Sequence, residues 1–180
     1  MQPDKTINSI SEQLINSDEI DIHRNAPVPN PACLYGLVGE VAKAGSKGNE
    51  SNPFAIATNF LAYLSCAIGR GTFLQIGNTD HHPRIFTLHV GRSGRGRKGD
   101  SLALVIKIDE FMRAQTPMLC PQIHRGGLSS REGLAALIQD GYEHGSQEVT
   151  GTEDKRLWVV ESEFASCANM AWLCGSSKRT

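Results

Sequence analysis

The sequence predicts a mixed α/β fold, and three features of the chain lead to this prediction. Two segments with apolar residues at helical spacing come first, over 31–44 and 53–69. A glycine-rich stretch over 91–99 then stands between an apolar run and a helix-like segment. The apolar run 157–160 ends in acidic residues, as a buried strand of a parallel sheet would. Together these features predict a small helical region followed by an α/β core.

Length and composition limit the classes of protein to consider. The 180 residues suit one domain of ordinary size. With 18 Lys+Arg against 19 Asp+Glu the net charge is near zero, so any affinity for nucleic acid must come from a local patch. The five cysteines are odd in number and form no CxxC pair, which predicts neither a disulfide framework nor a zinc knuckle. No apolar stretch is long enough to span a membrane, and we expect a cytoplasmic protein without a membrane partner.

Residues 1–29 are predicted to form a flexible tail, and residues 30–71 a helical region. The tail is mostly polar and ends in the proline-rich APVPNP, which disfavours helix. Leu and Val then recur at helical spacing over 31–44, with Asn30 placed to cap that helix and Gly45 to end it.

A second helix and two strands are expected next. The helix begins at Asn52 or Pro53, and its apolar character on most faces predicts that it is buried. The runs TFLQIG and RIFTLHV, residues 72–77 and 84–90, are typical of strands, and the turn-rich NTDHHP between them allows a hairpin.

Two further helices are expected after the glycine-rich stretch. The segment 101–114 is long enough for a helix and alternates less than a strand would. The segment 129–140 is better marked, because Ser129 and Glu132 form a capping-box pattern at its start. The remaining expected elements are a polar loop at 143–156, a strand at 157–160 and a helix at 165–175.

The stretch HVGRSGRGRKGDS, residues 89–101, has the composition of a phosphate-binding loop. A strand that runs into a glycine-rich turn and then into a helix lets backbone N–H groups and the helix N-terminus hold phosphates. The strict pattern G-x-x-x-x-G-K-[ST], started at Gly91, finds Arg97 where lysine belongs and misses by one residue. With one extra residue accepted, Lys98 becomes the cation for the β/γ-phosphates and Ser101 the hydroxyl for Mg²⁺. A solvated basic loop is the alternative interpretation.

A second candidate motif is DKRLWVVESEF, residues 154–164. Its apolar residues end in Glu161 and Glu163, as expected for a buried strand that delivers carboxylates to its C-terminal edge. In a Walker B strand of this kind, Glu161 would hold Mg²⁺ and Glu163 would polarise the attacking water. The alternative is a strand that ends in a solvated acidic turn.

Three motifs in one order resemble the P-loop ATPase domain of phage- and plasmid-type primase-helicase proteins, a family related to the RepA-like replicative helicases. They are GRSGRGRKGDS, GLSSREGL and DKRLWVVESEFA, and the similar region runs from about Pro29 to Met170. That family's loop carries an Arg-Lys-Gly form, so Arg97, Lys98 and Ser101 correspond directly. Asp100 departs from the family, which has threonine there.

The resemblance implies an incomplete RecA-like or AAA-like core over 72–175, with a tail at 176–180. It implies an ATP- and Mg²⁺-binding domain of a replication-associated helicase or primase-type protein of mobile elements, with DNA as a partner and an ATP site shared between subunits of a ring. We expect a truncated copy, because the sensor residue and arginine finger of such ATPases are not found after Glu163. The expected catalytic residues are Glu161 and Glu163, the Mg²⁺ ligands Ser101 and Glu161, and the nucleotide-binding residues Gly91, Ser93, Gly94, Gly96, Arg97, Lys98, Gly99, Asp100 and Ser101.

Two other interpretations stay open at the level of the sequence. One is a non-catalytic module that kept the fold, lost ATP turnover and binds the backbone of nucleic acid, with His124 and Arg125 adding to a positive surface. The other is a gene remnant that does not fold stably, because a core cut after its Walker B strand leaves a sheet edge uncovered.

Overall fold

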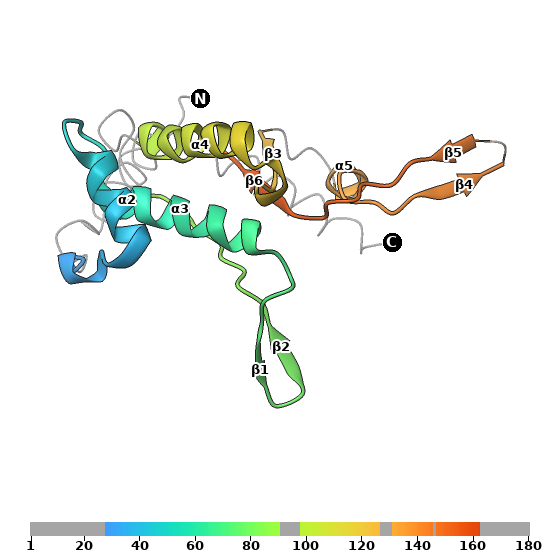
Figure 1. The fold of residues 1–180 in the computed structure, drawn as a ribbon, viewed down its shortest axis with the longest axis horizontal. Helices are drawn as coiled ribbons and strands as arrows, with labels where there is room; N and C mark the ends of the chain where they lie inside the picture. Colours follow the sequence, from blue (N-terminus) through green and yellow to red (C-terminus); the bar gives the residue numbers. More distant parts are fainter. Residues whose placement is uncertain (1–27, 91–97, 127–130, 146, 163–180) are drawn as a thin grey trace, which may run out of the picture. The chain divides into compact units, whose positions relative to one another are not determined.

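The fold is a mixture of helices and short strands, and its elements can be followed from blue to red in Figure 1. The computed structural model describes residues 28–90, 98–126, 131–145 and 147–162. The chain divides into two compact units, Met1–Cys33 and Leu34–Thr180. In the part of the chain that is described, no helix is long and apolar enough to cross a membrane.

The described part of the first unit contains the short 3₁₀ helix η1, Pro31–Cys33. The Asn30 side chain caps it, because its Oδ1 accepts a hydrogen bond from the backbone N–H of Ala32 at 3.0 Å. The predicted capping role of Asn30 is therefore confirmed, but the helix that it begins is only one turn long.

The described second unit contains three long helices: α2 (Gly36–Ser46), α3 (Pro53–Ile68) and α4 (Lys98–Gln115). The expected helix at 31–44 is wrong in its first half, because Tyr35 is extended and Gly36 has a φ of 59°, which interrupts the helical path. Helix α3 is confirmed, since the Asn52 side chain accepts from the N–H of Phe54 at 2.9 Å and Gly69 ends the helix. Helix α4 confirms the expectation at 101–114 and begins three residues earlier.

The first hairpin is formed by β1 (Leu74–Ile76) and β2 (Thr79–His81), which pair antiparallel. A hairpin was expected here, but its second strand lies inside the segment that was expected to be the connection. Gly77, with a φ of 61°, and Asn78 form a two-residue turn. The chain therefore reverses at the start of the expected connection, and the second strand begins at Thr79.

Residues 84–90 are neither helix nor strand, so the strand expected there is wrong. Among the described residues, no backbone hydrogen bond involves residues 85–90. Phe86, Leu88 and Val90 point away from the protein and are 95%, 65% and 83% exposed. His89 alternates with them and is half-buried against α3.

A parallel pair of strands, β3 (Gln122–Arg125) and β6 (Leu157–Val160), forms the second sheet. Its register places Gln122 beside Leu157 and Arg125 beside Val160. The predicted strand at 157–160 is confirmed by β6, whereas β3 was not predicted.

The region between β3 and β6 contains a short helix and a second hairpin. Helix α5 (Arg131–Ala136) is shorter than the helix expected at 129–140, and Ser129 of its predicted capping box lies outside the described residues. The expected loop at 143–156 is wrong in its first part, where β4 (Tyr142–His144) and β5 (Gln147–Val149) pair antiparallel. Gly145, with a φ of 64°, provides the turn. The expected helix at 165–175 lies outside the described residues.

The core of the second unit lies where α3 and α4 meet β6. Phe60 and Tyr63 of α3, Val105 and Ile106 of α4, and Trp158 of β6 are buried together. The rings of Tyr63 and Trp158 meet edge to face, with centroids 5.5 Å apart. A second cluster joins α2 to α3 through Ala42, Ile56 and Ala57.

Polar side chains are buried within this core, and they fix how α4 lies on α3. Asp109 is 3% exposed, and its Oδ1 accepts a hydrogen bond from the Tyr63 hydroxyl at 2.9 Å. Arg113 donates to both carboxylate oxygens of Asp109, at 3.1 and 3.0 Å. Burial raises the pKa of Tyr63, and its hydrogen bonds with Cys120 and Asp109 raise it further. The phenol therefore stays protonated and donates to Asp109.

Arg156, the residue before β6, holds three segments together. Its guanidinium donates to the carbonyl of Ala67 near the end of α3 at 2.7 Å, and to the carbonyl of Met118 at 2.7 Å. Met118 belongs to the 3₁₀ helix η2, Pro117–Leu119. The carboxylate of Asp154 accepts from Arg156 at 2.8 Å, and this hydrogen bond lowers the pKa of Asp154. Arg156 thus ties the start of β6 to α3 and η2.

We expect Arg156→Met to lower the free energy of unfolding by about 2 kcal/mol, because it removes charge-assisted hydrogen bonds to the carbonyls of Ala67 and Met118. Urea denaturation measures the change. Lys155→Met is the matched control: Lys155 pairs with Asp140, whose side chain is 94% exposed, so the loss should be small. Equal losses in the two variants would contradict the role given to Arg156.

Candidate functional site

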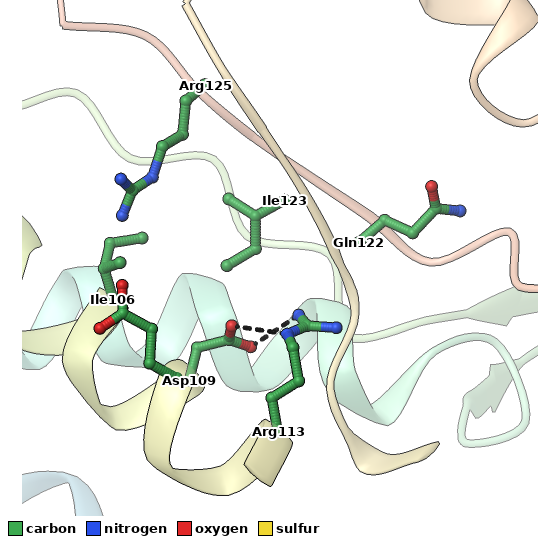
Figure 2. Close-up of a pocket in the computed structure, with 7 residues that line it drawn as sticks. Ile106, Asp109, Arg113, Gln122, Ile123 and Arg125 are labelled. Carbon is green, nitrogen blue, oxygen red and sulfur yellow. Dashed lines mark hydrogen bonds and ion pairs between the residues drawn. The ribbon is translucent and has the colours of Figure 1, made fainter. Parts of the chain in front are cut away.

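Helix α4 runs antiparallel to β3, and this direction decides which ends of the elements meet. A hollow of about 410 Å³ between them is lined by Ile106, Asp109, Glu110 and Arg113 from α4 and by Gln122, Ile123 and Arg125 from β3. Figure 2 shows Ile106 toward the Arg125 end of β3 and Arg113 toward the Gln122 end. Arg113 also donates to the carbonyl of Pro121, just before β3, at 2.7 Å. The amino end of α4 and the carboxyl ends of β3 and β6 therefore lie at the same end of the unit.

Glu161 follows directly after β6 at this end. Its Oε1 is buried and has no hydrogen-bond partner among the described residues. Gly126, with a φ of 68°, donates its N–H to the carbonyl of Val160 at 3.0 Å, and a Cβ at Gly126 would lie 3.9 Å from Oε1 of Glu161. A buried carboxylate oxygen without a partner is costly. Glu161 is therefore suited to a cation or a proton donor that the described residues do not supply.

The chemistry of Glu161 fits one side of a Mg²⁺ site. Mg²⁺ is usually held by one or two carboxylates together with water and substrate phosphates, not by a cage of protein ligands. No group of three or more His, Cys, Asp or Glu side chains that could hold a metal occurs in the described ranges. Glu163, the second predicted catalytic carboxylate, lies outside the described residues.

Lys98, Gly99 and Asp100 form the exposed first turn of α4. The first N–H groups of a helix lack partners within the helix and carry partial positive charge, so this turn can attract an anion. Asp100 is the acidic residue of the first turn, where a carboxylate stabilises the helix dipole. That local role accounts for an aspartate at a position where a phosphate loop would favour a neutral residue. The other predicted loop residues, Gly91, Ser93, Gly94, Gly96 and Arg97, lie outside the described residues.

Ser101 is fully buried between α3 and α4. Its hydroxyl donates to the carbonyl of Lys98 at 2.8 Å and accepts from Nδ2 of Asn59 at 3.2 Å. A hydroxyl engaged in this way offers no exposed lone pair to a metal. The predicted role of Ser101 as a Mg²⁺ ligand gains no support from this arrangement.

The two ends of the glycine-rich loop lie close to each other. Nε2 of His89 is 3.3 Å from the hydroxyl of Thr58 on α3. The pKa of His89 is lowered, first by burial and then by the positive charge of Lys98. Asn59, the next residue of α3 after Thr58, contacts Ser101 in the first part of α4, so the chain enters and leaves the glycine-rich segment beside the same part of α3.

Of the expected strand–loop–helix unit, the helix is present, the strand is not, and the loop lies outside the described residues. Residues 85–90 are not a strand, and the neighbour of β6 is β3. The sequence predicts Arg125 only as part of a general basic surface and indicates no role for Gly126. The four-residue run QIHR followed by two glycines was the available signal, but a strand of that length has too few residues to show a period of two.

Comparisons of the chain with models of protein families, with curated proteins and with solved structures find no match. The candidate site is therefore defined by geometry: the amino end of α4, Glu161 with an oxygen that has no described partner, and the adjoining end of β3.

Replacing Lys98 should raise the pKa of His89 part of the way toward its ordinary value of 6.5, because burial remains when the positive charge is removed. A lowered pKa means that His89 contributes stability above its ordinary pKa and that this contribution is lost as the pH falls through the folded-state pKa. Lys98→Met should make this loss smaller.

Titration of His89 by NMR in Lys98→Met measures the shift. Lys107→Met, which removes an exposed lysine farther along α4, is the control and should leave the pKa of His89 unchanged. If the two variants give the same titration curve for His89, the two ends of the loop are not close.

Proposed function

We propose that the chain is a nucleotide-binding domain of the P-loop ATPase type with a RecA-like or AAA-like core, which takes ATP together with Mg²⁺. The observation that carries this proposal is the antiparallel packing of α4 on β3, which brings the amino end of α4 to the carboxyl edge of the sheet. In α/β proteins ligands bind at that edge, and phosphates bind at helix N-termini.

Each described group has a defined task in this proposal. The first turn of α4 and the Lys98 ammonium attract the phosphates. Glu161 holds the metal through the carboxylate oxygen that has no partner within the described chain. The bound Mg²⁺ would neutralise charge on the phosphate oxygens. The glycine-rich loop at 91–97 and Glu163 keep the roles predicted from the sequence.

The biological setting in the proposal comes from the sequence resemblance alone. It is a replication-associated helicase or primase-type protein of mobile elements, located in the cytoplasm, with DNA as a partner and subunits arranged in a ring. The near-neutral composition is compatible with this setting only if contact with DNA is made through a local basic surface.

Titration with fluorescent ATP, in Mg²⁺ and in EDTA, tests the site. We expect Lys98→Ala to weaken binding about tenfold or more in both conditions, because it removes a charge from the phosphates. We expect Glu161→Gln to weaken binding only in Mg²⁺, because its carboxylate acts through the metal. Lys107→Ala should bind as the wild type does.

Two outcomes would overturn the proposal. One is the absence of saturable ATP binding by the folded wild-type chain. The other is equal affinity of the wild type and Lys98→Ala, which would remove the amino end of α4 from the site.

A non-catalytic module that binds the backbone of nucleic acid is the second candidate, and the buried Ser101 hydroxyl favours it over a working ATPase. This candidate predicts binding to a single-stranded oligonucleotide that ATP does not change. Its affinity should fall steeply between 50 and 200 mM salt, roughly as expected when several phosphates are neutralised.

A further inference from the structure

Strand β3 has an open edge on the side away from β6. The N–H groups of Gln122 and Gly126 donate to carbonyls of the β6 segment at 2.8 and 3.0 Å. Because every second residue of a parallel strand bonds to the same neighbour, the N–H and C=O groups of Ile123 and Arg125 point to the other side. Neither residue forms a backbone hydrogen bond on that side with any described residue. Their backbone groups are therefore available to an added strand.

The hollow beside α4 lies on this open side of β3. Its lining residues come from α4 and β3, and none of the described residues of β6 is among them. Figure 2 shows the side chains of Ile123 and Arg125 on the same side of β3, with Ile106 of α4 near the Arg125 end. An extended peptide can add to a sheet edge of this kind and place its alternate side chains in a hollow next to it. The volume of about 410 Å³ is large enough for such side chains.

One positive charge in the hollow has no partner among the described residues. Arg113 is bound to the carboxylate of Asp109 and to the carbonyl of Pro121. Arg125 is exposed, and its guanidinium makes no hydrogen bond or ion pair with any described residue. Glu110 lines the α4 side of the hollow without an ion pair to Arg125, and it disfavours a second carboxylate on that side. An acidic side chain is therefore favoured only on the β3 side.

We propose that the open edge of β3 binds an extended peptide of a partner protein, and that Arg125 selects a peptide with an acidic side chain. The peptide backbone bonds to Ile123 and Arg125, which gives affinity whatever the peptide sequence. The pairing of a carboxylate with the guanidinium gives the preference. An apolar side chain two positions from the acid lies over Ile123 and Ile106, because alternate side chains of a strand share a face.

Selection from a phage-displayed library of random seven-residue peptides, with the full chain as the target, tests the proposal. We expect the enriched peptides to share an aspartate or glutamate with an apolar residue two positions away. Fluorescence anisotropy of one labelled, enriched peptide then measures its affinity. Arg125→Glu should weaken binding about tenfold or more, and it should strengthen binding of the same peptide with lysine in place of the acid.

Arg70→Glu is the matched control. It makes the same charge change at an exposed arginine that follows Gly69, close to Arg156 at the amino end of β6 and so at the other end of the unit. It should leave the affinities for both peptides unchanged. Thermal unfolding at the wild-type midpoint confirms that Arg125→Glu is folded, as expected for an exposed side chain without described partners.

Amide hydrogen exchange measured by NMR tests the backbone part of the proposal. The bound peptide should slow the exchange of the Ile123 and Arg125 amides about tenfold or more, because they become donors to the added strand. The amide of Gly126, which already donates to β6, should change little. A peptide that binds without slowing the first two amides would overturn strand addition.

Three further outcomes would overturn the proposal. If no peptide is enriched, Arg125 is only a charge that protects an open sheet edge from association. A dimer in size-exclusion chromatography that Arg125→Glu dissociates would assign the edge to a second copy of the chain. Binding of a single-stranded oligonucleotide that Arg125→Glu abolishes, with peptide binding unchanged, would assign the arginine to nucleic acid.

The proposal is independent of the proposed nucleotide site. Glu161 follows Val160 and so comes level with Gly126, which places it on the opposite face of the strand pair from Arg125. Arg125→Glu should therefore leave ATP binding unchanged within about twofold, and Lys98→Ala should leave peptide binding unchanged. The two proposals can fail separately.

Discussion

The register of α4 on α3 is set by two buried polar contacts, and the candidate site depends on that register. Apolar side chains alone would tolerate small shifts between two helices, because hydrophobic burial is not directional. The buried carboxylate of Asp109 does not tolerate such shifts, because it must keep its hydrogen bonds with Tyr63 and Arg113 to offset its lost hydration. The contact of Asn59 with Ser101, two helical turns earlier, adds a second fixed point. Together they place the first turn of α4 beyond the carboxyl edge of β3 and β6.

Two arginines bind backbone carbonyls at the opposite end of the same unit. Arg156 binds carbonyls from α3 and η2, and Arg113 binds the carbonyl of Pro121 before β3. These bonds satisfy carbonyls that helix ends and loops leave without partners. The amino ends of both parallel strands are thereby tied to the helices, whereas the carboxyl ends carry Glu161 and Arg125 without partners among the described residues. Charges bound to other parts of the chain thus lie at one end of the strands, and charges without described partners lie at the other.

The sequence predicts the parts of the fold that rest on local physics. Asn52, Pro53 and Gly69 mark the limits of α3, and the apolar run at 157–160 marks β6. The sequence does not predict β3. This four-residue segment forms a strand because it pairs with β6, more than 30 residues away, and its own residues do not indicate that partner. The burial of Ser101 is missed for a related reason. Its serine hydroxyl fits a metal-binding loop and a helix contact equally well, and only the packing of Asn59 decides between them.

The same limit applies to the candidate site. The glycine-rich stretch and the acidic end of β6 are visible in the sequence, so Lys98 and Glu161 could be named in advance. That Glu161 has an oxygen without a partner among the described residues, and that Arg125 lies beside Val160, follows from the packing and pairing of two strands and has no signature in either segment alone.

The exposed segment 84–90 has a consequence for how copies of the chain behave toward one another. Phe86, Leu88 and Val90 form an apolar row, the run from Ile85 to Val90 has no acidic residue, lysine or arginine, and its backbone groups are not used in any described sheet. These are the properties of an aggregation-prone strand edge. We therefore expect these six residues, just ahead of the glycine-rich loop, to favour association between copies of the protein at high concentration.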